Sequence, residues 1–482
     1  MVANEGRVMA DKRHAFCDDA MGEMDACGIA EAIQNRRVSA ADVVEAAIAR
    51  AEIINPDLNT IVIKLYDQAR RQVAKDRDLP LFGVPTFVKD NDNVAGLPTQ
   101  MGTGAFRARK AKANSKFVNQ FLSTGLCLLG KSTMPEFGFV CSTENPKWGI
   151  TRNPWNINHT TGGSSSGSAA LVASGVVPIA TANDGAGSIR IPAAICGLVG
   201  LKPTRGRFYS VDRSEKMPIE LVHQGVLTRS VRDTALFLAE AEKFYLPSHL
   251  TKIGHIQNAH KKRLKIAFTA NPKEGQLGHI EDEVFQVYQS MRQRLIDMGH
   301  QVEEIDFPDD AEQLQEHFIR YYGFLSFLLT RLSPLTLGRN VDQTMLEPFT
   351  LGLRKGFEKT IPKIFASIAQ LKQAGQRTEA DLARFDVICN PVVTRVTPEI
   401  GYFSPNLSYE DVADRAIRFA IYCGIYNVSG SPSLALPCGV SSSGLPIGLQ
   451  FAARQGGEKT LLELGYEIEQ AYPFAKITGT KS

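Results

Sequence analysis

Two short clusters of glycine and serine place hydroxyl groups on tight backbone turns, at 162–168 (GGSSSGS) and at 185–188 (GAGS). A serine hydroxyl can donate or accept a hydrogen bond and can attack a carbonyl carbon, while glycine lets the backbone turn tightly. Between the clusters, residues 168–174 predict a helix and residues 176–180 predict a buried strand. Catalytic groups are commonly carried on loops at the ends of such rigid elements.

A flexible linker is the alternative interpretation of these clusters, because glycine–serine runs occur more often in linkers than in catalytic sites. The segments that follow them, ALVASGVVPIA and IPAAICGLVGL, are apolar and are expected to be buried, which argues against a linker. Composition alone leaves both interpretations open.

A lysine ends the apolar segment LFGVPTFVKD at 81–90, which predicts a turn and a buried strand. Lys89 is either a surface residue at the end of this strand or a buried functional group. Burial would lower the pKa of its amine by desolvation, so that the neutral amine could accept a proton. Lys89 is therefore a candidate general base.

Residues 125–132 (GLCLLGKS) match the pattern of a phosphate-binding loop. The four middle residues are Leu, Cys, Leu and Leu, which favour burial over a loop around phosphates. The segment before it, 117–123, predicts a helix, whereas a phosphate loop follows a strand. We therefore reject a nucleotide site here and predict a core strand.

Residues 163–167 (GSSSG) match the nucleophile elbow of α/β-hydrolases, centred on Ser165. That elbow follows a strand, and the polar segment 151–161 does not predict one. It also needs a later histidine, typically near the end of the chain. The last histidine is His317, and residues 318–482 contain none. A Ser-His-Asp site is therefore not expected, and His159 beside the loop is interpreted as structural or exposed.

The composition describes a soluble globular protein, since 43% of the 482 residues are hydrophobic and 22% are charged. A net charge of +3 gives no reason to expect nucleic acid binding. No apolar run reaches the ~20 residues that cross a bilayer, and the N-terminus lacks the apolar core of a secretory signal. We therefore expect a cytoplasmic protein. The eight cysteines show no metal-ligand spacing, so free thiols and no metal site are expected.

The order of predicted elements favours an α/β architecture. Residues 1–27 predict a flexible tail, followed by helices at 28–35 and 40–54, the second ending at the Asn55–Pro56 pair. Beyond residue 205, strands alternate with helices to the end of the chain. The region 308–380 is predicted to be mostly helical. Its aromatic residues form either part of the core or a lid over a pocket, and they are Phe318, Tyr321, Tyr322, Phe324 and Phe327.

Six collinear motifs identify a family resemblance. They are GVPTFVKDN (83–91), TENPKWGITRNPWN (143–156), GGSSSGSAALVASG (162–175), DGAGSIRIPA (184–193), GLVGLKPTRG (197–206) and NVSGSPSLALP (427–437). The chain from 28 to 477 resembles the amidase signature hydrolases. Within that family it looks most similar to amidases of the 6-aminohexanoate cyclic-dimer hydrolase type, through residues 183–207 and TRVTPEIG at 394–401.

The resemblance implies one amidase signature domain over 28–482, with a mixed, mainly parallel central sheet flanked by helices. It also implies a catalytic triad, in which the family's nucleophile falls on Ser188, its bridging serine on Ser164 and its lysine on Lys89. In the family the bridging serine follows a cis peptide bond, which here would join residues 163 and 164. The substrate pocket region would be the mostly helical segment at about 308–380.

The remaining site residues also follow from the resemblance. The backbone N–H groups of Gly185, Ala186, Gly187 and Ser188 would form the oxyanion hole. Phe137 and Gly138 match positions that border the family's acyl pocket.

The sequence departs from the family pattern at Ser166 and Ala186, where the family usually has glycine. Because alanine carries a Cβ, residue 186 is expected to keep a negative φ, which affects the shape of the oxyanion hole and not its existence. Asp184 and Arg190 flank the nucleophile loop and are expected to pair.

The implied function is hydrolysis of a small-molecule amide through an acyl-enzyme, without a cofactor and, by analogy, in a homodimer. The substrates would include cyclic or linear aminoalkanoate amides. One alternative is the glutaminase subunit of a tRNA-dependent amidotransferase, working with partner subunits and ATP. A second is a non-enzymatic nucleotide-binding protein, which rests on 125–132 alone.

Overall fold

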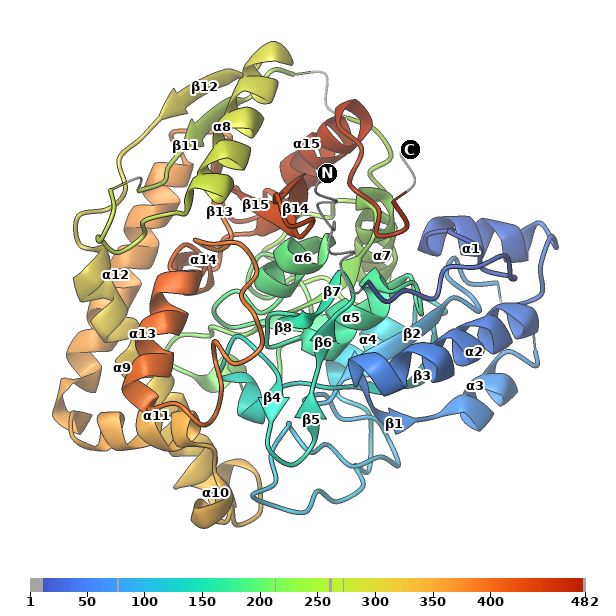
Figure 1. Cartoon of the computed structure of the whole chain (residues 1–482), viewed down its shortest axis with the longest axis horizontal. Helices are drawn as coiled ribbons and strands as arrows, with labels where there is room; N and C mark the ends of the chain where they lie inside the picture. The colour runs from blue at the N-terminus through green and yellow to red at the C-terminus, as the bar shows by residue number, and fades with distance from the viewer. Residues whose placement is uncertain (1–11, 76–77, 213, 260–261, 272, 480–482) are drawn as a thin grey trace, which may run out of the picture.

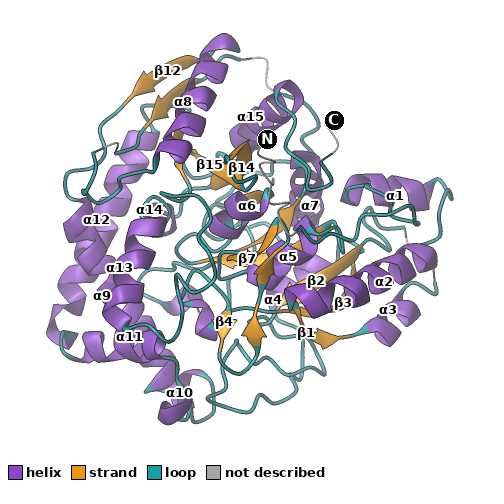
Figure 2. Cartoon of the chain, in the orientation of Figure 1, coloured by secondary structure: helices purple, strands orange, loops and turns teal. Residues whose placement is uncertain are grey.

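The computed structural model describes residues 12–75, 78–212, 214–259, 262–271 and 273–479. In this part of the chain, eleven strands form one sheet in the order β1-β3-β2-β8-β10-β9-β14-β15-β13-β11-β12 (Figures 1 and 2). They are β1 (Ile61–Lys64), β2 (Pro85–Lys89), β3 (Cys127–Ser132), β8 (Ile179–Asp184), β9 (Val199–Lys202), β10 (His223–Thr228), β11 (Lys265–Phe268), β12 (Gln301–Glu304), β13 (Val387–Pro391), β14 (Ser433–Val440) and β15 (Pro446–Ala452).

The sheet is mixed, as expected, but among the described strands its parallel pairings are the minority. The four parallel pairings are β2 with β3, β2 with β8, β11 with β12 and β11 with β13. The other six are antiparallel, including the hairpin of β14 and β15. Antiparallel neighbours can be joined by a short connection, as between these two strands, whereas parallel neighbours need a longer crossover.

Helices cover the sheet and also gather away from it. The α-helices are α1 (Ala26–Gln34), α2 (Ala40–Leu58), α3 (Tyr66–Gln72), α4 (Lys116–Leu122), α5 (Ser166–Ala173), α6 (Arg190–Cys196), α7 (Val231–Phe244), α8 (Asp282–Asp297), α9 (Ala311–Thr330), α10 (Ser333–Thr336), α11 (Pro348–Glu358), α12 (Ile364–Leu382), α13 (Tyr409–Ala420), α14 (Gly424–Ser429) and α15 (Glu458–Ala471). The region 308–380 is mostly helical, as predicted, and α9, α11, α12 and α13 pack together on the left of Figure 1.

Helix α2 continues through Pro56 to Leu58, beyond the end predicted at residues 55–56. Proline removes one backbone donor, and here it does so only in the last turn of the helix. Asn59 then closes the helix in a left-handed conformation, with its N–H donating to the carbonyl oxygen of Asn55 at 2.8 Å. The side chain of Asn55 also accepts from the N–H of Thr60, which fixes the exit from the helix.

The segment 12–25 packs against the body of the protein, so within it the expected tail over 1–27 is not found. Met21 is fully buried, and the guanidinium of Arg50 on α2 donates to Asp19 at 2.6 Å and to the carbonyl oxygen of Gly175 at 2.7 Å. Helix α1 begins at Ala26, capped by Asp25. Residues 1–11 lie outside the described residues.

Two segments singled out by their motifs have clear structures. Residues 127–132 form β3, a fully buried strand of the sheet, which confirms the rejection of a phosphate loop. The segment 151–161, in which no strand was predicted, contains β6 (Arg152–Asn153) and β7 (Asn156–Thr160), which pair with each other outside the main sheet, and β7 also bridges to Glu399. Because this hairpin lies outside the main sheet, it is not the strand of a nucleophile elbow. Among the described helices, none has both the length and the apolar composition to span a membrane.

Candidate active site

Three segments that are distant in sequence meet where β2 and β8 end. These strands are parallel neighbours, so their carboxyl ends lie at the same edge of the sheet. Lys89 is the last residue of β2, and the loop 185–188 joins β8 to α6. The loop 161–165 leads into α5, a helix of small, fully buried residues that packs against both strands. The sheet therefore brings Lys89 and the two serine-bearing loops together.

Lys89 is 1% exposed, and its amine contacts three side chains. The Nζ atom lies 2.8 Å from the Oγ of Ser164, 3.0 Å from the Oγ of Ser165 and 2.7 Å from the Oδ1 of Asn183. Burial lowers the pKa of Lys89 to about 7, although the charges of Asp92 and Asp184 act in the opposite direction. A large fraction of this amine is therefore neutral near pH 7 and can accept a proton.

The peptide bond between Gly163 and Ser164 is cis. Ser164 is buried, and its hydroxyl faces both Lys89 and Gly138. Gly138 has a φ of +75°, and a Cβ built on it would lie 3.1 Å from the Ser164 Oγ. Phe137, next to it, is buried among aromatic side chains and also has a positive φ, of 49°. The predicted pocket residues Phe137 and Gly138 therefore lie beside Ser164.

Ser188 lies on a loop that Asp184 holds in place. The Asp184 carboxylate accepts from the N–H of Gly187 at 2.7 Å and from the N–H of Ile189 at 3.2 Å, on either side of Ser188. The hydroxyl of Ser165 donates to the main-chain oxygen of Ser188 at 2.6 Å. Ser165 therefore connects the loop 185–188 directly to the amine of Lys89.

The expected pairing of Asp184 with Arg190 is confirmed. Arg190 Nη2 lies 2.8 Å from Asp184 Oδ1, and both side chains are fully buried. Burial alone would raise the pKa of Asp184, but the charge of Arg190 and hydrogen bonds from Arg190 and Asn427 hold it well below its usual range. Asp184 therefore stays a carboxylate and keeps the loop in one conformation.

The predicted oxyanion-hole donors are not equivalent in the structure. The N–H of Gly187 already donates to Asp184, so it is not available to a substrate oxygen. Within the described residues, the N–H groups of Gly185, Ala186 and Ser188 make no hydrogen bond. Ala186 does not have a positive φ, as expected for a residue with a Cβ.

The aromatic residues of α9 divide between the core and the site. Tyr321 is fully buried, and its hydroxyl donates to the main-chain oxygen of Ile219 at 2.7 Å, which makes it structural. The hydroxyl of Tyr322 lies 3.0 Å from the position that a Cβ on Gly185 would take. The Tyr322 ring stacks on Phe318 and meets the edge of Phe139. The core interpretation therefore holds for Tyr321, whereas the lid over a pocket stays a prediction.

Sequence analysis missed the roles of Asn183 and Tyr322. Asn183 is the penultimate residue of β8 and faces Lys89 from the neighbouring strand, a pairing that only the sheet order reveals. Tyr322 is more than a hundred residues away from the loop that it contacts. Within the described residues, no cluster of three His, Cys, Asp or Glu side chains is placed to hold a metal ion.

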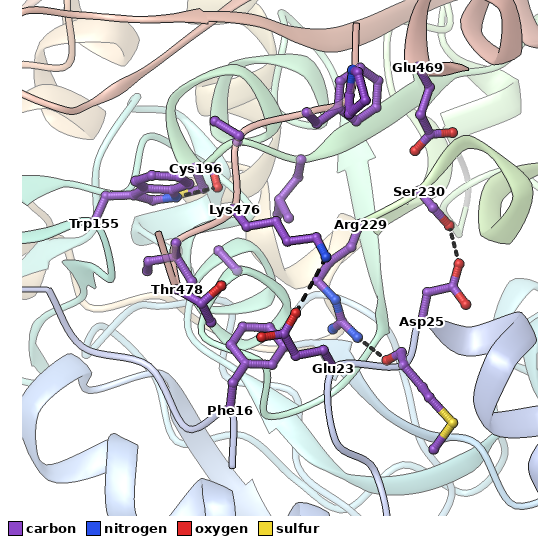
Figure 3. Close-up of a pocket in the computed structure, with 18 of the residues that line it drawn as sticks. Phe16, Glu23, Asp25, Trp155, Cys196, Arg229, Ser230, Glu469, Lys476 and Thr478 are labelled. Carbon is purple, nitrogen blue, oxygen red and sulfur yellow. Dashed lines mark hydrogen bonds and ion pairs between the residues drawn. The ribbon is translucent and has the colours of Figure 1, made fainter. Parts of the chain in front are cut away.

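A cavity of about 350 Å³ lies elsewhere, between residues 16–25, the start of α7 and the segment 473–478 (Figure 3). Its walls are tied together by Lys476 and Glu23 at 3.4 Å and by Ser230 and Asp25 at 2.7 Å. None of Lys89, Ser164 and Ser188 lines it. This cavity is therefore distinct from the candidate active site and marks where the two ends of the described chain pack together.

A family model described as Amidase matches residues 42–462. The chain belongs to the amidase signature family. This amidase is 43% identical over 466 residues to the putative amidase AmiC of Mycobacterium tuberculosis, with 96% of this chain and 98% of the relative covered. It is 31% identical over 475 residues to the 6-aminohexanoate-cyclic-dimer hydrolase of a Pseudomonas species, covering 93% and 95% of the two chains.

A solved structure of 6-aminohexanoate cyclic dimer hydrolase, complexed with substrate, superposes on this amidase with a TM-score of 0.85. The two chains are 29% identical, and the match covers 93% of this amidase and 97% of the other chain. The comparisons confirm the predicted family, the α/β fold and the enzyme class, a hydrolase of carbon–nitrogen bonds.

Proposed function

We propose that this amidase cleaves its substrate with Ser188 as the nucleophile, Ser164 as the proton relay and Lys89 as the base. The observation that carries the proposal is the 2.8 Å contact between the Ser164 hydroxyl and a buried amine whose pKa is lowered to about 7. An isolated serine hydroxyl is a weak nucleophile and needs an adjacent base. A neutral Lys89 supplies that base near pH 7.

Each proton in the proposed cycle has a donor and an acceptor. Lys89 accepts a proton from Ser164 while Ser164 accepts one from Ser188, and the Ser188 Oγ attacks the amide carbonyl carbon. The N–H groups of Gly185, Ala186 and Ser188 stabilise the resulting oxyanion. The proton on Lys89 returns through Ser164 to the amide nitrogen, and the carbon–nitrogen bond breaks to leave an acyl-enzyme. Water then attacks the ester by the same relay, releasing the acid and restoring the Ser188 hydroxyl.

We propose cyclic or linear aminoalkanoate amides as the substrate class. The named relative and the solved structure act on, or are complexed with, a substrate of this type, and both are similar over almost their whole length. The walls beside the triad also suit an alkyl chain, since Phe137, Phe139 and Phe318 lie around the catalytic loops.

The test combines a panel of amides with a fluorophosphonate probe that labels activated serines. The wild-type protein should hydrolyse the aminoalkanoate amides, and those substrates should protect Ser188 from the probe. Ser188→Ala should lose the labelling and lower kcat by at least about a thousandfold, as for other serine hydrolases without their nucleophile. Ser123→Ala removes a serine hydroxyl that only contacts its own helix, and it serves as the control. Near-native turnover by a folded Ser188→Ala protein would show that another residue attacks.

A further inference from the structure

Three arginines converge on a second cavity, of about 500 Å³, on the outer side of the helical region. Arg107 and Arg109 belong to the segment that precedes α4, and Arg339 follows α10. The rest of the lining consists of Phe106, Pro334, Gly338 and Asn340. The cavity therefore has three positive charges and no acidic residue in its wall.

These charges are not neutralised by the protein. Within the described residues, no carboxylate lies at ion-pair distance from Arg107, Arg109 or Arg339. Asp342, the acid nearest to Arg339 in sequence, instead accepts from the N–H and the hydroxyl of Thr344, at 2.9 and 2.7 Å. Burial, and with it the charge of Arg109, lowers the pKa of Arg339.

The guanidinium of Arg339 is held in one orientation while part of it stays unpaired. Its Nε donates to the main-chain oxygen of Leu337 at 3.3 Å, and its Cζ lies 5.0 Å from the centre of the Phe106 ring. Its Nη1 is buried and has no hydrogen-bond partner. A planar guanidinium in a cavity wall suits a carboxylate, which can accept from two of its N–H groups at once.

Packed aromatic rings lie between this cavity and the catalytic loops. Phe106 contacts Phe137 at 6.3 Å between ring centroids, and Phe137 contacts Phe139 at 6.2 Å. Gly138 lies between these two residues and faces the Ser164 hydroxyl. Phe106, which lines the cavity, is therefore linked through the buried ring of Phe137 to the residue that faces Ser164.

We propose that Arg107, Arg109 and Arg339 form a subsite for a carboxylate. The carboxylate is either the far end of an amide substrate that contacts Phe106 in the cavity wall, or a free carboxylate ion. The first source rests on the function proposed above, and the second does not depend on it.

The substrate source is tested with dicarboxylic acid monoanilides of graded chain length and with their methyl esters. The double variant Arg109→Gln/Arg339→Gln should raise KM for the best monoanilide about tenfold, the loss expected for a hydrogen bond to a charged group. It should leave KM for the ester and kcat for both nearly unchanged. Arg331→Gln, which removes an exposed arginine of the same segment outside the cavity, is the charge-matched control.

The free-ion source is tested by calorimetric titration of sodium hexanoate into the Ser188→Ala protein, with hexanamide as the neutral comparison. Binding of hexanoate alone, lost in the double arginine variant, supports the subsite even if no substrate is turned over. Selective loss of monoanilide affinity supports the substrate source. The subsite is refuted if hexanoate does not bind and the double arginine variant changes KM for the monoanilide and for the ester by the same factor. If the wild-type protein does not hydrolyse the amides, that result counts against the proposed function, and the hexanoate titration still tests the subsite.

Discussion

At the scale of single residues, the two N–H donors and the lone pair of a neutral Lys89 amine match its three neighbouring side chains. A neutral amine has two N–H donors and one lone pair. The Oδ1 of Asn183 and the Oγ of Ser165 accept the two donors, at 2.7 and 3.0 Å. The lone pair then faces the hydroxyl of Ser164 at 2.8 Å, and the hydroxyl of Ser165 is used by Ser188. This arrangement directs the amine at the hydroxyl that loses a proton in the proposed mechanism.

The pH dependence of the reaction tests the role of Lys89. The proposed mechanism requires the neutral amine, so kcat/KM should be low where the amine is protonated and should rise with pH through a pKa near 7. The change Asn183→Asp places a carboxylate at the amine and should raise the pKa of Lys89, moving this rising limb upward by about 1 to 3 pH units. A rate–pH profile of both proteins measures the shift.

The matched control is Asn183→Leu, which removes the acceptor without adding a charge and should not move the limb upward. A limb near ~10.4 in the wild type, the value of an exposed lysine, would contradict a buried base.

At the scale of elements, loops bring the reactive groups close, and small residues make room for them. Gly138 reaches the Ser164 hydroxyl only because it lacks a side chain and has a φ of +75°. A buried carboxylate, Asp184, then fixes the loop after β8 from both sides of Ser188. The strands determine where these loops start, and the contacts within the loops determine where the hydroxyls point.

The change Gly138→Ala should lower kcat, because its Cβ would lie 3.1 Å from the Ser164 Oγ. Gly456→Ala is the matched control, since Gly456 has a φ of +84° and no atom within 4 Å of the position that a Cβ would take. Both variants should lose about 1 kcal/mol of stability through backbone strain. Steady-state kinetics should show the loss of kcat only for Gly138→Ala. Equal activity of the two variants would mean that Gly138 does not border the reacting groups.

Two adjacent tyrosines of α9 give a second comparison at this scale. Tyr322→Phe removes a hydroxyl beside Gly185 and should change kcat/KM for amide substrates without a measurable change in folding. Tyr321→Phe removes a hydroxyl bonded to Ile219 and should cost about 1 kcal/mol of stability while leaving the kinetics unchanged. Kinetics and urea unfolding of both variants separate the two roles. The assignment is wrong if Tyr321→Phe alone alters selectivity.

At the scale of the whole molecule, one sheet combines strands from the early, middle and late parts of the described chain. Strands β2 and β8 carry the candidate site, and beyond β9 the sheet continues through β14, β15, β13, β11 and β12. The segment 12–25 is tied to this body by Arg50 and by the walls of the cavity in Figure 3. The N-terminal segment is therefore a structural part of the fold.

Arg50 tests that attachment. The change Arg50→Met leaves Asp19 and the carbonyl oxygen of Gly175 without their partner, and it should lower the unfolding free energy by about 3 kcal/mol. Urea unfolding measures the loss, and activity at low temperature should persist because Arg50 does not touch the site. Arg13→Met, which removes an exposed ion pair with Asp57, is the control and should change stability by less than about 1 kcal/mol. Similar unfolding curves for the two variants would show that 12–25 contributes little.

Local patterns in the sequence were sufficient to predict the family, the α/β class, the identity of β3 as a core strand and the candidate triad. The patterns are an apolar run that ends in Lys89, two glycine–serine loops and the motifs around them. The predicted end of α2 and the tail over 1–27 were wrong in part, because Asn59 and Arg50 supply contacts that a local pattern does not contain.

How these groups meet depends on the tertiary structure alone. The lowered pKa of Lys89 depends on complete burial, and its contact with Asn183 depends on β2 pairing with β8. The fold also decides that Asp184 accepts from the N–H of Gly187 and that the Tyr322 hydroxyl lies beside Gly185. Desolvation and hydrogen bonding depend on which atoms lie close together in space. Separation along the sequence does not reveal which atoms these are.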